Sequence, residues 1–397
     1  MIDKEKYCRE LTAELENILQ YWMAHTIDAD QGGFYGCIDN DNTISTKAPK
    51  GIVLNARILW TFSAAYNYTR DKKYLAIAER AYQYIFTHFT DKEYGGVYWS
   101  VDASGNMLND RKQVYGLAFY LYGLSEYYQA VQDPQLLDQA IHLFKLIEAK
   151  SFDAKRKGYF EAFARDWQPL PDLRLSNKDA NEKKTMNTHL HVIEAYANLY
   201  KQWPDELLRN RIIGLLEVFE EYMIDKDTGH LVLFFDENWK EKPDVISYGH
   251  DIEAAWLLQQ CAEIISDDNW QHKMKKHAIQ ITNAAMAGLD KDGGLWYEYD
   301  PAKDLLIKEK HWWPQAEAML GFFNAWQVSG KTDYLQLSFS SWSFVKQFIS
   351  DREGGEWVWG VNEDHSVMKG KDKVGLWKCP YHNSRACMEI IKRISRM

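Results

Sequence analysis

Apolar residues recur at helical spacing along most of the chain, in pairs of segments separated by short polar breaks. Between Gly51 and Phe89, the periodic stretch NARILWTFSAAYNY stops at TRDKK, and a second one, YLAIAERAYQYIFTHF, follows. This pattern predicts an αα-hairpin. Four further pairs of the same kind follow, and one helix remains at each end, at roughly residues 5–24 and 381–396. We therefore expect twelve helices in six pairs, with the terminal helices forming the sixth pair.

A glycine-bearing motif separates the pairs. It begins with Asp, continues for two to four residues to Gly or Gly-Gly, and ends in aromatic and β-branched residues, as in DKEYGGVYW. Such a turn predicts a short hairpin or an irregular strand pair. The six copies lie 61 to 71 residues apart, with aligned glycines at Gly33, Gly96, Gly158, Gly229, Gly294 and Gly355.

A closed ring of six hairpins buries both ends of the array against each other, so it needs no capping units. We therefore predict an all-α fold, an (α/α)6 barrel with short β-hairpin loops at one end, built as a single domain over residues 1–397. The longest irregular stretch, roughly 164–185, is charged and is expected to lie as a loop over the mouth of the ring.

Composition narrows the range of partners. The chain has 46% hydrophobic and 26% charged residues, as in soluble globular proteins. Its formal net charge of −10 argues against nucleic acid and anionic membranes and favours a small uncharged ligand. The 57 aromatic residues suit sugar rings, although a large core also holds many aromatic side chains.

Other features bear on location. Five scattered cysteines without C-x-x-C spacing indicate free thiols in a reducing compartment. The amino terminus has no apolar signal region, and no apolar run reaches the length of a membrane span. We expect a cytoplasmic monomer.

Unusual polar and aromatic residues gather in the first turns of the helices that follow the glycine-bearing loops. If alternate helices form a parallel inner ring, these first turns converge on one pocket, where helix amino termini favour developing negative charge. The residues are Asn55, Arg57, Tyr115, Asn187, His189, His191, His250, Glu253, Trp312, Trp313, Glu317, His382, Asn383 and Arg385.

Helical geometry sorts the first of these clusters. His189 and His191 lie about 200° apart around a helix, whereas Asn187 and His191 lie about 40° apart and share a face. A metal site of the H-x-H kind would need an extended segment, so we expect no metal here. His250 and Glu253 are three residues apart, so the carboxylate could orient the imidazole. The alternative for that pair is a surface helix cap.

Two further clusters suit a sugar. Trp313 and Glu317 are four residues apart, which places an aromatic platform beside an acceptor for a sugar hydroxyl, although core packing also explains the tryptophan. His382 follows Trp377 and Pro380 and therefore lies just inside a helix start, where a base is rigidly held.

Five ordered segments resemble the N-acylglucosamine 2-epimerase superfamily, and most closely its cellobiose 2-epimerase branch. The resemblance runs from about residue 20 to the carboxyl end. It implies an (α/α)6 barrel that reversibly inverts C2 of the reducing-end glucose in β-1,4-linked disaccharides, without metal or nucleotide. Cellobiose would give glucosyl-mannose, and lactose would give epilactose. The segments are NAR (55–57), KTMNTHLHVIEAY (184–196), GHDIEAAW (249–256), WWPQAEAM (312–319) and WKCPYHNSRACME (377–389).

The resemblance also implies roles for single residues. The acid/base histidines of the family match His250 and His382, a third active-site histidine matches His191, and the arginine near the substrate carbonyl matches Arg57. One departure is Ser384, where the family motif has Gly, a small-for-small change. The supporting and stacking positions match Tyr115, Asp179, Asn187, Glu253, Trp313 and Trp377.

The chemistry asks for such a set. Epimerisation beside a carbonyl requires ring opening, removal of the C2 proton and return of a proton to the opposite face. Two histidines can exchange the roles of base and acid near neutral pH. A fixed arginine such as Arg57 stabilises the enediolate more than the neutral sugar.

Other functions remain open at this point. They are an aldose–ketose isomerase or an N-acylglucosamine 2-epimerase of the same superfamily, a glycosidase, and a non-catalytic sugar-binding toroid. An inverting glycosidase needs two carboxylates about 6.5–9.5 Å apart, whereas the conspicuous groups here are histidines. The sequence contains no GxxxxGK[ST] phosphate loop of the kind that binds ATP.

Overall fold

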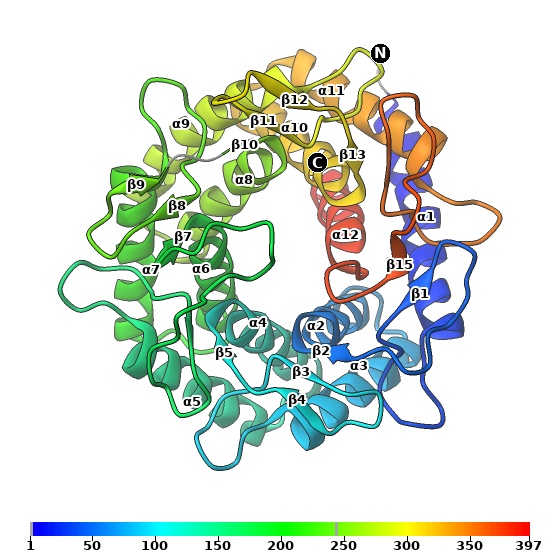
Figure 1. The fold of residues 1–397 in the computed structure, drawn as a ribbon. Helices are drawn as coiled ribbons and strands as arrows, with labels where there is room; N and C mark the ends of the chain where they lie inside the picture. The colour runs from blue at the N-terminus through cyan, green and yellow to red at the C-terminus, as the bar shows by residue number, and fades with distance from the viewer. Residues whose placement is uncertain (1–2, 243–244) are drawn as a thin grey trace.

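The computed structural model describes residues 3–242 and 245–397, which form two concentric rings of helices (Figure 1). Neighbouring inner helices pack against one another, and α12 closes the ring against α2. The inner helices are α2 (Ile52–Thr69), α4 (Val114–Val131), α6 (Met186–Tyr200), α8 (Tyr248–Ile264), α10 (Trp312–Ser329) and α12 (Tyr381–Ser395). The outer helices are α1 (Lys4–His25), α3 (Lys72–Tyr84), α5 (Pro134–Ser151), α7 (Glu206–Val218), α9 (Asp268–Ala285) and α11 (Thr332–Phe344).

This arrangement confirms the predicted (α/α)6 barrel of twelve helices within the described residues. The terminal helices α1 and α12 pack together as the sixth pair. The inner helices are buried on almost all sides, as in α2 from Ile52 to Ala65, because the outer ring covers them. Outer helices bury only one face. None of the helices in the described part of the chain is long and apolar enough to cross a membrane.

Short antiparallel strands fix the starts of the inner helices. A strand before an inner helix pairs with a strand of the following repeat. Each small sheet therefore links two consecutive repeats of the ring. The strands are β1 (Ile38–Asp39), β2 (Lys50–Gly51), β3 (Ser100–Val101), β4 (Met107–Asn109), β5 (Lys112–Gln113), β6 (Ala162–Phe163), β7 (Lys184–Thr185), β8 (Phe234–Phe235), β9 (Glu241–Lys242), β10 (Ile246–Ser247), β11 (Glu298–Asp300), β12 (Leu305–Ile307), β13 (Lys310–His311), β14 (Gly360–Val361) and β15 (Asp372–Val374).

The repeated Asp–Gly motif is a tight turn closed by one strand bridge, as between Thr90 and Val97. At Gly33, φ is +62°, and a Cβ atom would lie 2.6 Å from the ring of Tyr84, so only glycine fits. Five repeats also bond the first Asp of the turn to a buried lysine that comes shortly before an inner helix. These pairs are Asp28–Lys50, Asp91–Lys112, Asp153–Lys184, Asp290–Lys310 and Asp351–Lys373.

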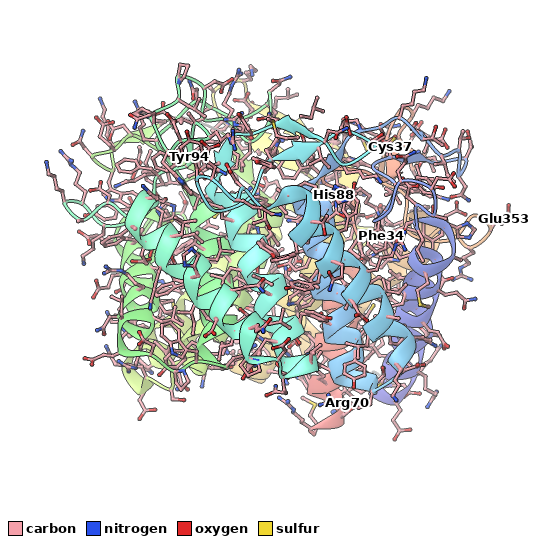
Figure 2. All side chains as sticks on the ribbon, turned by 90° about the horizontal axis from the view of Figure 1, so that it is seen from below. Phe34, Cys37, Arg70, His88, Tyr94 and Glu353 are labelled. Carbon is pink, nitrogen blue, oxygen red and sulfur yellow. The ribbon has the colours of Figure 1, made fainter. Side chains whose placement is uncertain are left out.

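All glycine-bearing loops lie at one end of the barrel. In the side view of Figure 2, Cys37 and Tyr94 mark that end, and Arg70, at the carboxyl end of α2, marks the opposite one. The inner helices therefore run parallel, with their amino termini beside the loops. The irregular stretch before β7 lies at the same end, and its residues 173–176 and 178–180 line the cavity described below, as predicted for a loop over the ring mouth.

Candidate active site

A cavity of about 650 Å³ opens where the amino termini of the inner helices converge. The residues assigned a catalytic or substrate-binding role all line its wall except Glu317. Those that do are Arg57, Tyr115, Asp179, Asn187, His191, His250, Glu253, Trp313, Trp377 and His382. Of the other first-turn residues expected at the pocket, Trp312 also lines it, whereas Asn55, His189, Asn383 and Arg385 do not.

The predicted orientation of the first histidine pair is confirmed. Asn187 and His191 line the cavity, whereas His189 is buried in the wall behind it. Its Nε2 atom accepts a hydrogen bond from the backbone N–H of Tyr159 at 2.8 Å, and its Nδ1 atom lies 2.7 Å from the carbonyl oxygen of Thr185. His189 is therefore structural.

Each of the three cavity histidines predicted from the sequence is anchored through Nδ1. His191 Nδ1 lies 3.0 Å from an oxygen of Glu194, and His382 Nδ1 lies 2.7 Å from Oε1 of Glu317. His250 Nδ1 lies 2.8 Å from the hydroxyl of Ser247. These contacts fix the three rings and leave Nε2 as the nitrogen available to a ligand.

Two expectations need correction. Glu253 does not orient His250, because that ring is bonded to Ser247; the Oε1 atom of Glu253 accepts from Arg385 at 2.7 Å and lies 3.7 Å from Nδ1 of His382. Glu317 does not stand ready for a sugar hydroxyl. Its side chain is buried beneath the cavity, where it contacts His382, Arg385 and Trp256. Both carboxylates bond residues of other inner helices, so spacing along one helix could not identify their partners.

Trp313 contacts both candidate acid/base histidines. Its ring centroid is 4.8 Å from that of His250 and 5.6 Å from that of His382. The histidines come from α8 and α12, which are separated by α10 in the inner ring. Two imidazoles from different helices therefore meet at one aromatic surface, which suits a sugar ring bound within reach of both.

Arg57 is a buried, rigid cation. Its Nη2 atom donates to the hydroxyl of Tyr115 at 2.8 Å, its Nη1 atom donates to the carbonyl oxygen of Trp377 at 3.4 Å, and its guanidinium lies 4.2 Å from the ring centre of Phe119. Among the described residues, no carboxylate forms an ion pair with it. Its charge is therefore available to a developing oxyanion.

Burial controls the protonation of the histidines. It lowers the pKa of His191 to about 4 and the pKa of His250 to about 3, and it also holds the pKa of His382 well below its usual range. All three rings are thus neutral near pH 7 and can act as bases. A negative charge that forms on a bound ligand raises the pKa of the ring facing it and allows that ring to keep a proton.

Two polar residues on the cavity wall differ in whether their side-chain oxygens already accept hydrogen bonds. The carboxylate of Asp179 accepts from the backbone N–H and the hydroxyl of Ser176, at 2.8 and 2.9 Å, which fixes the loop locally. The Oδ1 atom of Asn187 is buried and has no hydrogen-bond partner among the described residues. Asn187 is therefore available to accept from a ligand.

One group of side chains has the composition of a cation site: Glu253, Glu317 and His382 bring ligand atoms within 4.8 Å of one another. However, Nη2 of Arg385 already donates to Oε1 of both carboxylates, and Nδ1 of His382 contacts the same Glu317 oxygen. A guanidinium thus occupies the place that a metal would need.

Sequence reasoning missed several site residues. Glu194 follows His191 by three residues, the same spacing that was considered for His250 and Glu253, so this pair could have been found. Ser247 lies before the helix, and no helical periodicity identifies it. Glu161, whose carboxylate accepts from Thr185 and Thr188, comes from the hairpin of a neighbouring repeat.

Comparison with known proteins decides the family. The model of the N-acylglucosamine 2-epimerase family matches residues 33–386. The chain belongs to this family. A cellobiose 2-epimerase from Bacteroides fragilis is 45% identical over 98% of both chains, and one from Dictyoglomus turgidum is 38% identical over 97% of this chain and 98% of its own. As an N-acylglucosamine 2-epimerase family member, the chain is a carbohydrate epimerase and hence an isomerase.

The fold comparison agrees. The solved structure of cellobiose 2-epimerase from Bacillus thermoamylovorans superposes with a TM-score of 0.94 at 40% identity, and the match covers 98% of this chain and 100% of the other. The family resemblance inferred from the five sequence segments is therefore confirmed.

Proposed function

We propose that this N-acylglucosamine 2-epimerase family member is a cellobiose 2-epimerase. It reversibly inverts C2 of the reducing-end glucose in β-1,4-linked disaccharides, converting cellobiose to glucosyl-mannose and lactose to epilactose. The observation that carries the proposal is the convergence of His250 and His382, from two different inner helices, on the ring of Trp313, with the cation Arg57 in the same cavity.

The reaction proceeds through the open-chain aldehyde. One histidine, in its neutral form, removes the C2 proton through Nε2, and the resulting cis-enediolate places negative charge on oxygen near Arg57. That charge raises the pKa of the other histidine, which takes up a proton from solvent and returns it to the opposite face, while the first ring releases its proton to solvent. Acid/base catalysis of this kind contributes about 10²–10⁴-fold. The electron pair left at C2 is held by the enediolate until reprotonation, so the reaction needs no external oxidant.

The two histidines differ in what supports them. His382 is bonded to a carboxylate, Glu317, whereas His250 is bonded to the neutral hydroxyl of Ser247. A carboxylate stabilises the imidazolium that forms when a ring takes up the substrate proton. In the reverse direction the two rings exchange roles.

The second sugar ring has an aromatic outer compartment. Tyr297 and His311 stack at 3.8 Å between ring centroids, and Trp359 packs against His311 at 5.9 Å. All three residues line the cavity, beyond the histidine pair. Such surfaces suit the apolar faces of a pyranose, which favours a disaccharide over a single hexose.

Further proposals concern the whole protein. We propose that residues 1–397 act as one catalytic domain, since closure of the ring uses both α1 and α12. Five free thiols suit a cytoplasmic location. The guanidinium between Glu253 and Glu317 favours chemistry without metal. The protein is expected to act as a monomer on a small neutral sugar, without nucleic acid or membrane.

Incubation with lactose tests the function. The proposal predicts epilactose. Lactulose as the main product would indicate an aldose–ketose isomerase, glucose plus galactose would indicate a glycosidase, and unchanged lactose with measurable binding would indicate a sugar-binding toroid. A parallel incubation with an N-acylglucosamine tests the remaining alternative. Epimerisation of that sugar but not of lactose would indicate an N-acylglucosamine 2-epimerase activity.

A further inference from the structure

Arg385 lies beneath the cavity, fully buried on α12, and bonds carboxylates from three other inner helices. Its Nη1 atom donates to Glu194 on α6. Its Nη2 atom lies 2.7 Å from Oε1 of Glu253 on α8 and 2.7 Å from Oε1 of Glu317 on α10. One planar cation therefore ties four of the six inner helices together.

Two of these carboxylates also hold a cavity histidine. Glu194 lies 3.0 Å from Nδ1 of His191, and Glu317 lies 2.7 Å from Nδ1 of His382. A continuous line of hydrogen bonds thus runs from His191 through Glu194, Arg385 and Glu317 to His382. Every side chain along it is buried, so water does not screen these charges from one another.

We propose that Arg385 is a positioning residue that couples His191 to His382 through Glu194 and Glu317. The inference rests on the proposed function for its catalytic meaning, but the coupling itself is a property of the free protein. Because one guanidinium bonds both carboxylates, a change of charge or geometry at one histidine is transmitted to the other.

The local charges are not balanced by Arg385 alone. Three carboxylates surround one guanidinium, so the cluster holds a proton more readily than isolated carboxylates do. Burial and the nearby Glu317 raise the pKa of Glu253 to about 8, whereas for Glu194 burial is outweighed by the guanidinium together with His191 and the hydroxyl of Tyr381, and the pKa falls to about 2. The cluster therefore favours a proton on Glu253, beside His382, and an ionised partner for His191.

Other groups near the cluster also contribute to its field. The hydroxyl of Tyr381 donates to Glu194, and Trp256 lies under the guanidinium. On the side of α12 that packs against α1, Glu356 bonds Lys378 and Asn383. On this same side, Glu14 from α1 faces Cys387. The titratable and charged groups that face the cluster are Arg57 from α2, Tyr122 from α4, His191 and Glu194 from α6, Glu253 from α8, Glu317 from α10, and Tyr381 and His382 from α12.

The coupling is tested in the full chain without substrate, by nuclear magnetic resonance of the imidazole ring nitrogens and carbons of His191 and His382. Glu194→Gln removes a charge that His382 does not contact. It should move the His382 signals and lower the pKa of that ring by about half a unit or more, because the ring loses the direct field of Glu194 and Arg385 is less neutralised. The matched control is Glu126→Gln, because Glu126 is a buried carboxylate of α4 that bonds Asn67 and Asn198.

The same comparison in an Arg385→Lys variant tests whether Arg385 carries the coupling. Arg385→Lys keeps a positive charge but cannot bond three carboxylates at once. In this background Glu194→Gln should move the His382 signals much less, because only the direct field of Glu194 remains. The proposal is overturned if Glu194→Gln leaves His382 unchanged, if Glu126→Gln moves it equally, or if the shift is undiminished in Arg385→Lys. Should Arg385→Lys fail to fold, as judged by circular dichroism, the first two comparisons still decide.

Kinetics separates this inference from the function it builds on. Arg385→Lys should lower kcat about tenfold or more with little change in KM and should shift the pH profile of kcat/KM, because the substrate does not contact Arg385. A wild type that epimerises lactose but lacks the coupling overturns only the role of Arg385. A wild type that shows the coupling but forms no epilactose overturns only the function.

Discussion

Nδ1 of His382 on α12 lies 2.7 Å from Oε1 of Glu317 on α10. Both residues are buried, and the second oxygen of Glu317 accepts from the indole N–H of Trp256 at 2.9 Å. The carboxylate is thus held from two sides, and it fixes both the orientation of the imidazole and the position of its proton. A base at the cavity wall is therefore prepared before substrate binds.

Glu317→Gln should lower kcat by about 100-fold with a small change in KM, because an amide cannot stabilise the imidazolium that forms on His382. Initial rates of epilactose formation measure this. Glu148→Gln is the control, since Glu148 is a partly buried carboxylate of the outer helix α5 that bonds Tyr159, Tyr196 and Arg211. A Glu317→Gln enzyme with wild-type kcat would show that Glu317 has no part in positioning the base.

Trp377→Ala should raise KM for disaccharides about fivefold, because a stacking surface at the cavity wall is lost. The backbone carbonyl that accepts from Arg57 remains, so kcat should change less than KM. Trp377→Phe keeps an aromatic face and should restore most of the affinity. Wild-type KM and kcat in the Ala variant would make Trp377 a packing residue.

Exhaustive chelation should leave the activity intact, because the guanidinium of Arg385 already fills the space among Glu253, Glu317 and His382. The measurement is kcat/KM before and after removal of divalent ions. Activity that is lost to the chelator and restored by one divalent ion would contradict a mechanism without metal.

His189 should make the folded chain sensitive to acid. Burial lowers its pKa to about 3, whereas an unfolded histidine titrates near about 6.5. Between these values only the unfolded chain binds the proton, so the free energy of unfolding falls as the pH falls, by up to about 1.4 kcal/mol per pH unit. Protonation would also break the bond from the Tyr159 N–H to Nε2.

His189→Gln removes this titration and keeps an acceptor for Tyr159. Urea unfolding of the variant and the wild type at about pH 7.5 and about pH 5 measures the effect. Relative to the wild type, the variant should gain about 2 kcal/mol on acidification. An unchanged difference between the two proteins at both pH values would show that His189 does not carry this acid sensitivity.

The number and pairing of the helices could be predicted because each follows from local patterns. Apolar residues at helical spacing mark α2 and α3 on either side of TRDKK, and Pro134 opens α5 with Asp133 as its cap. The place of the site followed from the parallel inner ring. These features depend on short stretches of sequence and on the symmetry of the repeat.

The partners of the catalytic groups could not be predicted in the same way. Glu317 and Glu253 bond residues of α12, because side chains that point into a closed ring meet those of other inner helices. The pairing of Lys50 with Asp28 likewise joins residues on either side of a turn. Such contacts depend on the closed geometry of the ring, which spacing along one segment does not contain.

The central claim is that His250 and His382 serve opposite faces of C2. Nuclear magnetic resonance of lactose in D2O tests it with the wild type, His250→Ala and His382→Ala, each checked for folding by circular dichroism. The two-histidine mechanism predicts deuterium at C2 of the epilactose formed by the wild type. Each variant should form no epilactose, although the surviving histidine can still exchange deuterium into C2 of lactose. Both folded variants producing epilactose at near wild-type rates would contradict the two-histidine mechanism.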